Sequence, residues 1–322
     1  MDSSKFTPVA KFRGNLIHAP EDGFISFFNS PFYSHKNMTG IDIYPSQLSF
    51  GGDVHSPVSG TIRKIQSFRG HSTLPNVSKL EYLILVQNDD DPSVYTKILH
   101  VKPARSLSQG EHIDIGDKIG EYIRSFFFAR WTDPHLHCEL RPKDDTVRAR
   151  GALQLNLCQK LDIFSKEYRK ISETPLEAKL VKHTPNALFL EVTEDAFSKQ
   201  KLTGLKVNIE KMGENVLYSG IIDAGIPHFG HGGIFTEDAY NISQGDIVKV
   251  NGIAIGKIFE TDPFNKFVRF HPYSFHIHWK DIAFKGISCR LSLKDRVIKI
   301  ITKSTNSFQY QIGDFDIVKF VT

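Results

Sequence analysis

The chain has 322 residues, of which 40% are hydrophobic and 24% are charged. This is the composition of a globular protein, long enough for two modest domains or one large one. The formal net charge is only +4, and the basic residues are scattered along the chain. The sequence therefore gives no case for a nucleic-acid partner.

Cysteine usage and the N-terminus bear on the compartment. Cys138, Cys158 and Cys289 form no CxxC pair and are odd in number, which argues against a disulfide framework and favours a reducing compartment. No basic start precedes an apolar segment at the N-terminus, and no apolar run approaches the length of a membrane span. We expect a cytoplasmic protein without a membrane span; export by another route and the oligomeric state stay open.

Residues 1–148 predict an all-β domain. The apolar run 80–87 ends in the turn-forming residues 88–92, and a second apolar run follows at 95–101. Glycines at 110, 116 and 120 suit tight turns between short strands. Strong helical periodicity is absent from this part of the sequence.

Two polar motifs stand in apolar strand contexts. His135 and His137 are separated by Leu136, and on a strand residues i and i+2 project from the same face, so the two imidazoles are expected side by side. Asp42 lies between Ile41 and Ile43, where a buried carboxylate is costly unless it is paired or binds a metal. The alternatives are an exposed His pair at a strand edge and an Asp42 that faces solvent.

An aromatic segment precedes the His-Leu-His motif. Phe126, Phe127 and Phe128 are followed by Arg130 and Trp131. One interpretation is an altered pocket with Arg130 and Trp131 on its rim. The other is a hydrophobic hairpin that packs on a neighbouring element.

The composition changes after residue 148. Residues 149–185 are rich in Leu, Lys and Glu and are predicted to form a short helical linker. Residues 186–322 are predicted to form a second β-rich domain of unknown role. Its expected strands are 187–193, 205–211, 246–255, 267–270, 275–280, 297–302 and 315–321.

The second region also contains histidines. His276-Ile277-His278 repeats the His-apolar-His form, and His231-Gly-Gly-Ile-Phe235 resembles a His-x-Gly-Ile-Asp that lacks its Asp. A decayed half-copy of the first domain and a coincidence between β-hairpins both explain these patterns. A second metal site formed by His228, His231, His276 and His278 stays open.

Taken together, residues 35–142 resemble the M23 family of zinc metallopeptidases, the lysostaphin-like and LytM-like cell-wall endopeptidases. Several short motifs of that family occur in the right order over about a third of the chain. The matching parts are Gly40–Ile43, Val54–Ile62, Ile98–Val101, Gly116–Gly120 and Pro134–Glu139.

The resemblance implies an antiparallel β domain that hydrolyses a peptide bond with a Zn²⁺-activated water. Asp42 and His137 would be zinc ligands. His100 and His135 would be catalytic imidazoles beside the open coordination position, moving protons or stabilising the oxyanion. The implied substrate is a peptide or a peptidoglycan-like polymer.

The chain departs from the family at the first ligand. The family has a His four residues before the Asp, and Met38 stands there; a thioether is a poor ligand for Zn²⁺ among oxygens and imidazoles. His35 is the expected replacement. His18 or His55 is an alternative, and a site without metal is another.

Three functions follow. The first is a zinc-dependent metallopeptidase-like hydrolase with His35, Asp42 and His137 as ligands. The second is a catalytically inactive module of the same fold, used for binding or scaffolding. The third is a lipoyl-carrier-like barrel, for which the sequence offers no convincing modifiable lysine at a hairpin tip.

Overall fold

The computed structural model describes residues 5–158, 175–193, 196, 202–214, 216–303 and 310–321. Nearly all of its regular structure is antiparallel β-sheet, so the prediction of a mostly-β chain is confirmed. The chain divides into two compact units. The N-terminal unit comprises Met1–Phe27 and Phe32–Lys160, and the C-terminal unit comprises Phe28–Pro31 and Leu161–Thr322.

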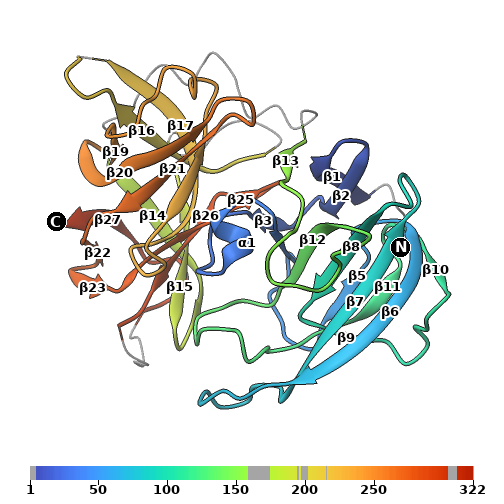
Figure 1. The fold of residues 1–322 in the computed structure, drawn as a ribbon. Helices are drawn as coiled ribbons and strands as arrows, with labels where there is room; N and C mark the ends of the chain where they lie inside the picture. The colour runs from blue at the N-terminus through green and yellow to red at the C-terminus, as the bar shows by residue number, and fades with distance from the viewer. Residues whose placement is uncertain are drawn as a thin grey trace. The chain divides into compact units, whose positions relative to one another are not determined.

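The N-terminal unit, blue to green in Figure 1, contains thirteen described strands and one short helix. These are β1 (Phe6–Phe12), β2 (Asn15–Pro20), β3 (Phe24–Ser26), α1 (Tyr33–Lys36), β4 (Ile41–Tyr44), β5 (Asp53–His55), β6 (Gly60–Arg69), β7 (Leu80–Asn88), β8 (Val94–Leu99), β9 (Val101–Pro103), β10 (His112–Ile113), β11 (Lys118–Tyr122), β12 (Leu136–Pro142) and β13 (Asn156–Leu157).

The main sheet of this unit has the strand order β10-β6-β7-β8-β12-β4-β3, and β12 lies between β8 and β4. The strand β12 is buried on both faces. Leu136, Cys138 and Leu140 form its apolar face, at 2% exposure or less. His137 and Glu139 alternate with them on the other face, so this polar row lies inside the unit and requires partners.

In the C-terminal unit, yellow to red in Figure 1, the secondary-structure elements of the described residues are strands. These are β14 (Leu176–Thr184), β15 (Ala187–Val192), β16 (Leu205–Glu210), β17 (Leu217–Ile226), β18 (Gly232–Phe235), β19 (Ile247–Val250), β20 (Ile253–Asp262), β21 (Phe267–Pro272), β22 (His276–Trp279), β23 (Ile282–Phe284), β24 (Gly286–Cys289), β25 (Leu291–Ser292), β26 (Val297–Ile301) and β27 (Phe315–Val321).

A closed sheet is the centre of this unit. The order β16-β19-β20-β21-β18-β17 returns to its start because β16 also pairs with β17. The strand β17 is long enough to pair with β16 through its first half and with β24 through its last residues. Its alternating apolar residues contribute to one large buried cluster.

The helical prediction for residues 149–185 differs from the structure at both ends. Asn156–Leu157 is strand β13 and Leu176–Thr184 is strand β14, whereas residues 159–174 lie outside the described residues. The sequence of β14 alternates buried Leu176, Ala178 and Leu180 with exposed charged residues. This period of two is the pattern of a strand, and it prevails over the helix-favouring composition.

Cys138, Cys158 and Cys289 are free and buried. Within the described part of the chain, no helix has the length and apolarity that crossing a membrane requires.

Candidate metal centre

The short helix α1 and the turn after it determine which of the side chains that precede Asp42 in the sequence contacts it. α1 ends at Lys36, with Asn37 as its C-cap. Met38 then has a φ of 52°, and the Thr39 N–H donates to the Ser34 carbonyl over 2.9 Å. This is a Schellman-type C-terminus, in which the residue after the cap adopts the left-handed conformation.

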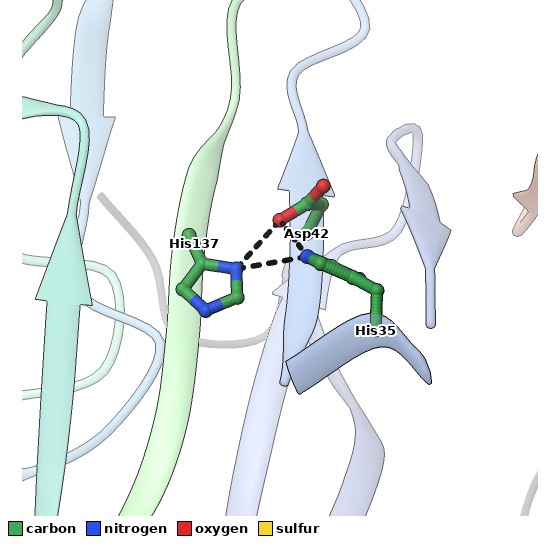
Figure 2. A group of neighbouring side chains, drawn as sticks. All are labelled: His35, Asp42 and His137. Atoms are coloured by element: carbon green, nitrogen blue, oxygen red, sulfur yellow. Dashed lines mark hydrogen bonds and ion pairs between the residues drawn. The ribbon is translucent and has the colours of Figure 1, made fainter. Parts of the chain in front are cut away.

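The turn separates the two candidates for the first ligand. His35 lies on α1 and points toward Asp42 and His137 (Figure 2). Met38 is fully buried in the apolar core instead. His18 on β2 and His55 on β5 are outside the group of donor atoms found in the described residues.

His35, Asp42 and His137 form one group whose donor atoms lie within 4.8 Å of one another. Asp42 and His137 face each other in the register of β4 and β12. The distances are 3.2 Å from His35 Nε2 to Asp42 Oδ1, 3.1 Å from His35 Nε2 to His137 Nδ1, and 2.9 Å from His137 Nδ1 to Asp42 Oδ1. The three donor atoms therefore form a triangle with sides of 2.9–3.2 Å.

These edges match the chemistry of a tetrahedral metal site. Zn²⁺ binds imidazole nitrogen and carboxylate oxygen at about 2.0–2.2 Å, so neighbouring ligand atoms of a tetrahedron lie roughly 3.3 Å apart. Two imidazole nitrogens and one carboxylate oxygen also form a donor set that zinc prefers. The residues present fit the ion.

His35 and His137 each have a hydrogen-bond partner outside the group of three donor atoms, and this partner determines which ring nitrogen faces Asp42. His35 Nδ1 lies 2.9 Å from the Phe27 carbonyl, which can only accept, so Nδ1 carries the proton and Nε2 offers a lone pair. His137 Nε2 lies 3.1 Å from Glu139 Oε1 and donates to it. Such outer contacts orient metal-binding imidazoles.

A proton at His137 Nδ1 is the alternative to a cation at the centre. Burial opposes the charged imidazolium, but the hydrogen bonds that His137 donates to the Asp42 and Glu139 carboxylates outweigh burial and raise the pKa of His137 to about 9. Burial alone would raise the pKa of Asp42, yet the imidazoles around it hold that pKa well below its usual value. Without a metal, the site is therefore a buried ion pair between Asp42 and a protonated His137.

Glu139 connects the centre to a row of buried charges. It faces Lys97 in the register of β12 and β8, and its Oε2 lies 3.2 Å from Lys97 Nζ and 3.1 Å from an Arg141 amino nitrogen. Burial would raise the pKa of Glu139, but His137, Lys97 and Arg141 lower it to about 2. Glu139 is thus a permanent acceptor behind His137.

His135 precedes β12 and approaches the other oxygen of Asp42. Its Nδ1 donates to the Asp133 carbonyl over 2.8 Å, and its Nε2 lies 3.5 Å from Asp42 Oδ2. Burial lowers the pKa of His135 to about 4, although Asp42 opposes the change. At neutral pH His135 is an uncharged imidazole with an available Nε2 lone pair.

His100 follows β8 with a φ of 68°. Its Nδ1 donates to Glu81 Oε2 over 2.8 Å and its backbone N–H donates to Glu81 Oε1 over 2.8 Å. The Ser125 hydroxyl also donates to this carboxylate. Glu81 is fully buried, and these bonds fix both the backbone and the ring of His100.

The five predicted site residues therefore lie together in the N-terminal unit, each between 2% and 7% exposed. The ring centroid of His100 is 5.2 Å from that of His135 and 6.1 Å from that of His137. Glu81 and Glu139 are further residues of the site that the motifs in the sequence did not identify. A charged residue at an alternating position of an apolar strand, the signal that identified Asp42, applies to both.

The aromatic segment packs on the site. The Phe128 ring stacks on His135 at 4.6 Å between centroids and lies 4.7 Å from the His100 ring. Phe127 lies against Phe68 and Phe32 and is 39% exposed. Phe128 of this segment thus lines the His100 and His135 imidazoles, and Tyr44 on β4 lies against His135 as well, with 4.9 Å between ring centroids.

The second His-apolar-His motif has a different environment. On β22, Ile277 and Trp279 are buried, whereas His276 is exposed and His278 is half-buried. β18, which ends at Phe235, pairs with β17 and β21 and not with β22. Across the residues that the structure describes, His35, Asp42 and His137 are the one group of three or more donors placed to hold a metal.

Comparisons with known proteins give limited similarity. The model of a domain of unknown function, the DUF8155 N-terminal domain, matches residues 18–157. A comparison with curated proteins finds no match.

Two solved structures resemble the chain weakly. One is a zinc-containing peptidase from Vibrio cholerae, with a TM-score of 0.23 and 21% identity over 35% of this chain and 29% of that one. The other is the solution structure of lysostaphin, with a TM-score of 0.23 and 13% identity over 73% of this chain and 82% of that one. The chain spans less than a third of the Vibrio peptidase, and similarity of this degree assigns no activity to it.

Proposed function

We propose that the N-terminal unit is a zinc-dependent hydrolase of the metallopeptidase type that cleaves a peptide bond. The observation that carries the proposal is the convergence of His35 Nε2, Asp42 Oδ1 and His137 Nδ1 with edges of 2.9–3.2 Å. Three protein ligands with one remaining position are typical of catalytic zinc, whereas structural zinc sites use four. When bound, the ion would polarise the scissile carbonyl and acidify a water molecule.

The remaining side chains would handle the proton and the substrate. His135 is neutral, is fixed at Nδ1 by the Asp133 carbonyl, and accepts a proton at Nε2. His100, held at Nδ1 by Glu81, presents its Nε2 from the neighbouring strand end, and it would donate from Nε2 to the oxygen that becomes negative when both of its ring nitrogens carry a proton. Positioned imidazoles of this kind contribute roughly 10²–10⁴-fold to hydrolysis.

A catalytically inactive binding module is the second candidate. The deep burial of the five residues and the stacking of Phe128 on His135 favour it. Its ion pair between Asp42 and a protonated His137 is satisfied without metal. The two candidates differ in metal content and in hydrolysis.

Two substitutions distinguish the role of a metal ligand from that of a catalytic residue. Asp42→Ala should lose the metal and all hydrolysis, whereas His135→Ala should retain the metal and lose hydrolysis by roughly 10²-fold or more. The assays are elemental analysis and the release of new amino termini from a mixture of unstructured oligopeptides.

Metal retained in Asp42→Ala would contradict the ligand assignment. Metal binding in the unsubstituted protein together with no release of amino termini would favour the binding module.

A further inference from the structure

Phe126, Phe127 and Phe128 follow one another in the N-terminal unit but have three different environments. Phe126 packs against Phe68 on β6, with 6.1 Å between ring centroids, and a Cβ atom at Gly70 would lie 2.3 Å from its ring. Phe128 is buried against the imidazoles of the candidate site. Phe127, between them, is 39% exposed. Its two neighbours therefore anchor the segment and leave the Phe127 ring at the surface.

Phe127 is surrounded by other aromatic rings of the same unit. Its ring centroid lies 4.6 Å from that of Phe126, 6.3 Å from that of Phe68 and 5.8 Å from that of Phe32. Phe32 is 46% exposed, whereas Phe68 and Phe126 are half-buried. We call these four residues the aromatic group. Single apolar side chains on a surface are ordinary, but neighbouring ones that form a patch are typical of a binding surface.

One buried carboxylate connects the aromatic group to His100. Glu81 accepts the backbone N–H and the Nδ1–H of His100, each over 2.8 Å. The same carboxylate accepts the Ser125 hydroxyl, and Ser125 Oγ in turn accepts the Phe127 N–H over 3.1 Å. The loop that presents Phe127 is therefore fixed before a ligand arrives, which lowers the entropy cost of binding.

Phe127 lies close enough to His100 for both to contact one substrate. Their ring centroids are 6.1 Å apart. An extended peptide advances about 3.3 Å per residue. A side chain one or two residues from the scissile bond therefore reaches the aromatic group while the bond itself lies at His100.

We infer that the aromatic group is a subsite for a large apolar side chain of the peptide substrate, near the bond that is cleaved. The inference rests on the proposed function and adds a substrate class to it: peptides with a side chain such as phenylalanine or leucine, and not peptides of glycine alone. Four phenylalanine side chains offer neither charge nor hydrogen-bond donors, and aromatic rings pack favourably on one another. Phe127 is the specificity-determining residue of this subsite.

The test is the binding of a fluorescein-labelled oligopeptide with one phenylalanine among glycines, measured by fluorescence anisotropy. The full chain is loaded with zinc and carries His135→Ala, which is expected to keep the metal and to lose hydrolysis, so that the peptide stays intact and its binding remains measurable. Adding Phe127→Ala should raise the Kd roughly tenfold, because part of the transfer free energy of the bound side chain is lost. Adding Phe127→Tyr should leave the Kd close to its starting value, because the ring is kept.

Phe12→Ala in the same background is the matched control. Phe12 is a half-buried phenylalanine at the end of β1 in the same unit, and the Arg13 guanidinium lies 5.1 Å from its ring centroid. It lies outside the aromatic group, so the Kd should not change. Circular dichroism and zinc content should be the same for the Phe127→Ala and Phe12→Ala variants, which excludes a general loss of structure.

The peptide provides the other half of the test. A peptide with alanine in place of phenylalanine should bind roughly tenfold more weakly when Phe127 is present, and this preference should shrink in Phe127→Ala because the partner ring is gone. A preference that stays undiminished in Phe127→Ala would overturn the inference. Equal Kd values for the Phe127→Ala and Phe12→Ala variants would do the same.

The proposed function and the inference fail by different results. Release of amino termini by the unsubstituted protein without preference between the phenylalanine and alanine peptides would overturn the inference alone. Preferential binding of the phenylalanine peptide without any release of amino termini would overturn the proposed hydrolysis, and it would support the aromatic group as the peptide-binding surface of an inactive module.

Discussion

At the scale of single residues, the central feature is that His137 Nδ1 can hold either a proton or a metal ion. Glu139 occupies the other ring nitrogen, so Nδ1 is directed at Asp42 Oδ1 and His35 Nε2 in either state. With a proton, His137 pairs with Asp42. With a metal ion, the same atom is a ligand.

This competition predicts a pH dependence. In the metal-free protein the pKa of His137 is raised to about 9, so its stabilising contribution is fully present below pH 6.5 and is lost as the pH rises through about 9. Metal binding must displace this proton, so zinc affinity should increase by up to roughly tenfold per pH unit between roughly pH 7 and 9.

A chelator-competition titration over this range, corrected for the titration of the chelator, measures the slope. A zinc affinity that does not change with pH would contradict the assignment of His137 as a ligand.

At the scale of elements, the turn that follows α1 explains how a candidate metal-binding group forms without a histidine at residue 38. The left-handed residue of the Schellman turn is Met38, whose side chain is fully buried. The turn leaves His35, one residue before the end of α1, directed at the strand pair β4 and β12. The candidate metal-binding group thus contains a histidine seven residues before Asp42, while Met38 occupies the position four residues before it.

Met38→His should therefore not raise zinc affinity. The imidazole would be placed in an apolar core without a partner, which should destabilise the protein by about 2–4 kcal/mol. Isothermal titration with zinc and urea unfolding measure the two effects, with Met38→Leu as the control for volume. A gain in zinc affinity for Met38→His would contradict the described turn.

The two His-apolar-His motifs differ because of what their strands face. On β12 the histidine face lies within the unit and contacts Asp42 and Glu139, whereas on β22 His276 is exposed and His278 is half-buried.

The double substitution His276→Ala/His278→Ala should leave the zinc stoichiometry unchanged and alter stability by less than about 0.5 kcal/mol per residue. Elemental analysis and urea unfolding check this expectation. Loss of zinc in this variant would indicate a second site on β22.

Local pattern predicted the part of the site that depends on strand geometry. Alternation of apolar and polar residues indicated that Asp42 and His137 are polar residues of apolar strands, and the structure adds that they face each other between β4 and β12. Strand β27 begins and ends where the sequence indicates. Alternation was overlooked at β14, where Leu, Lys and Glu suggested a helix. Whether Met38 or His35 faces Asp42 depends on the positive φ of Met38. The sequence does not indicate this conformation, because methionine has no preference for a positive φ.

At the scale of the whole molecule, the contact between Phe28 and Asp223 within the C-terminal unit is the least predictable feature. Phe28 and Asp223 are 195 residues apart in sequence, and no local pattern relates them. Composition predicts one boundary between the two domains, at a linker, whereas the four residues 28–31 of the N-terminal part of the sequence belong to the C-terminal unit.

The metal content of the protein purified without added metal and without a histidine tag is the most direct test of the proposed metal site. We expect about one zinc ion per chain, lost in both His35→Ala and Asp42→Ala and retained in His276→Ala/His278→Ala. Protein that holds no zinc after incubation with the ion and removal of the excess would contradict the account. The buried group would then be an ion pair between Asp42 and His137 and not a metal centre.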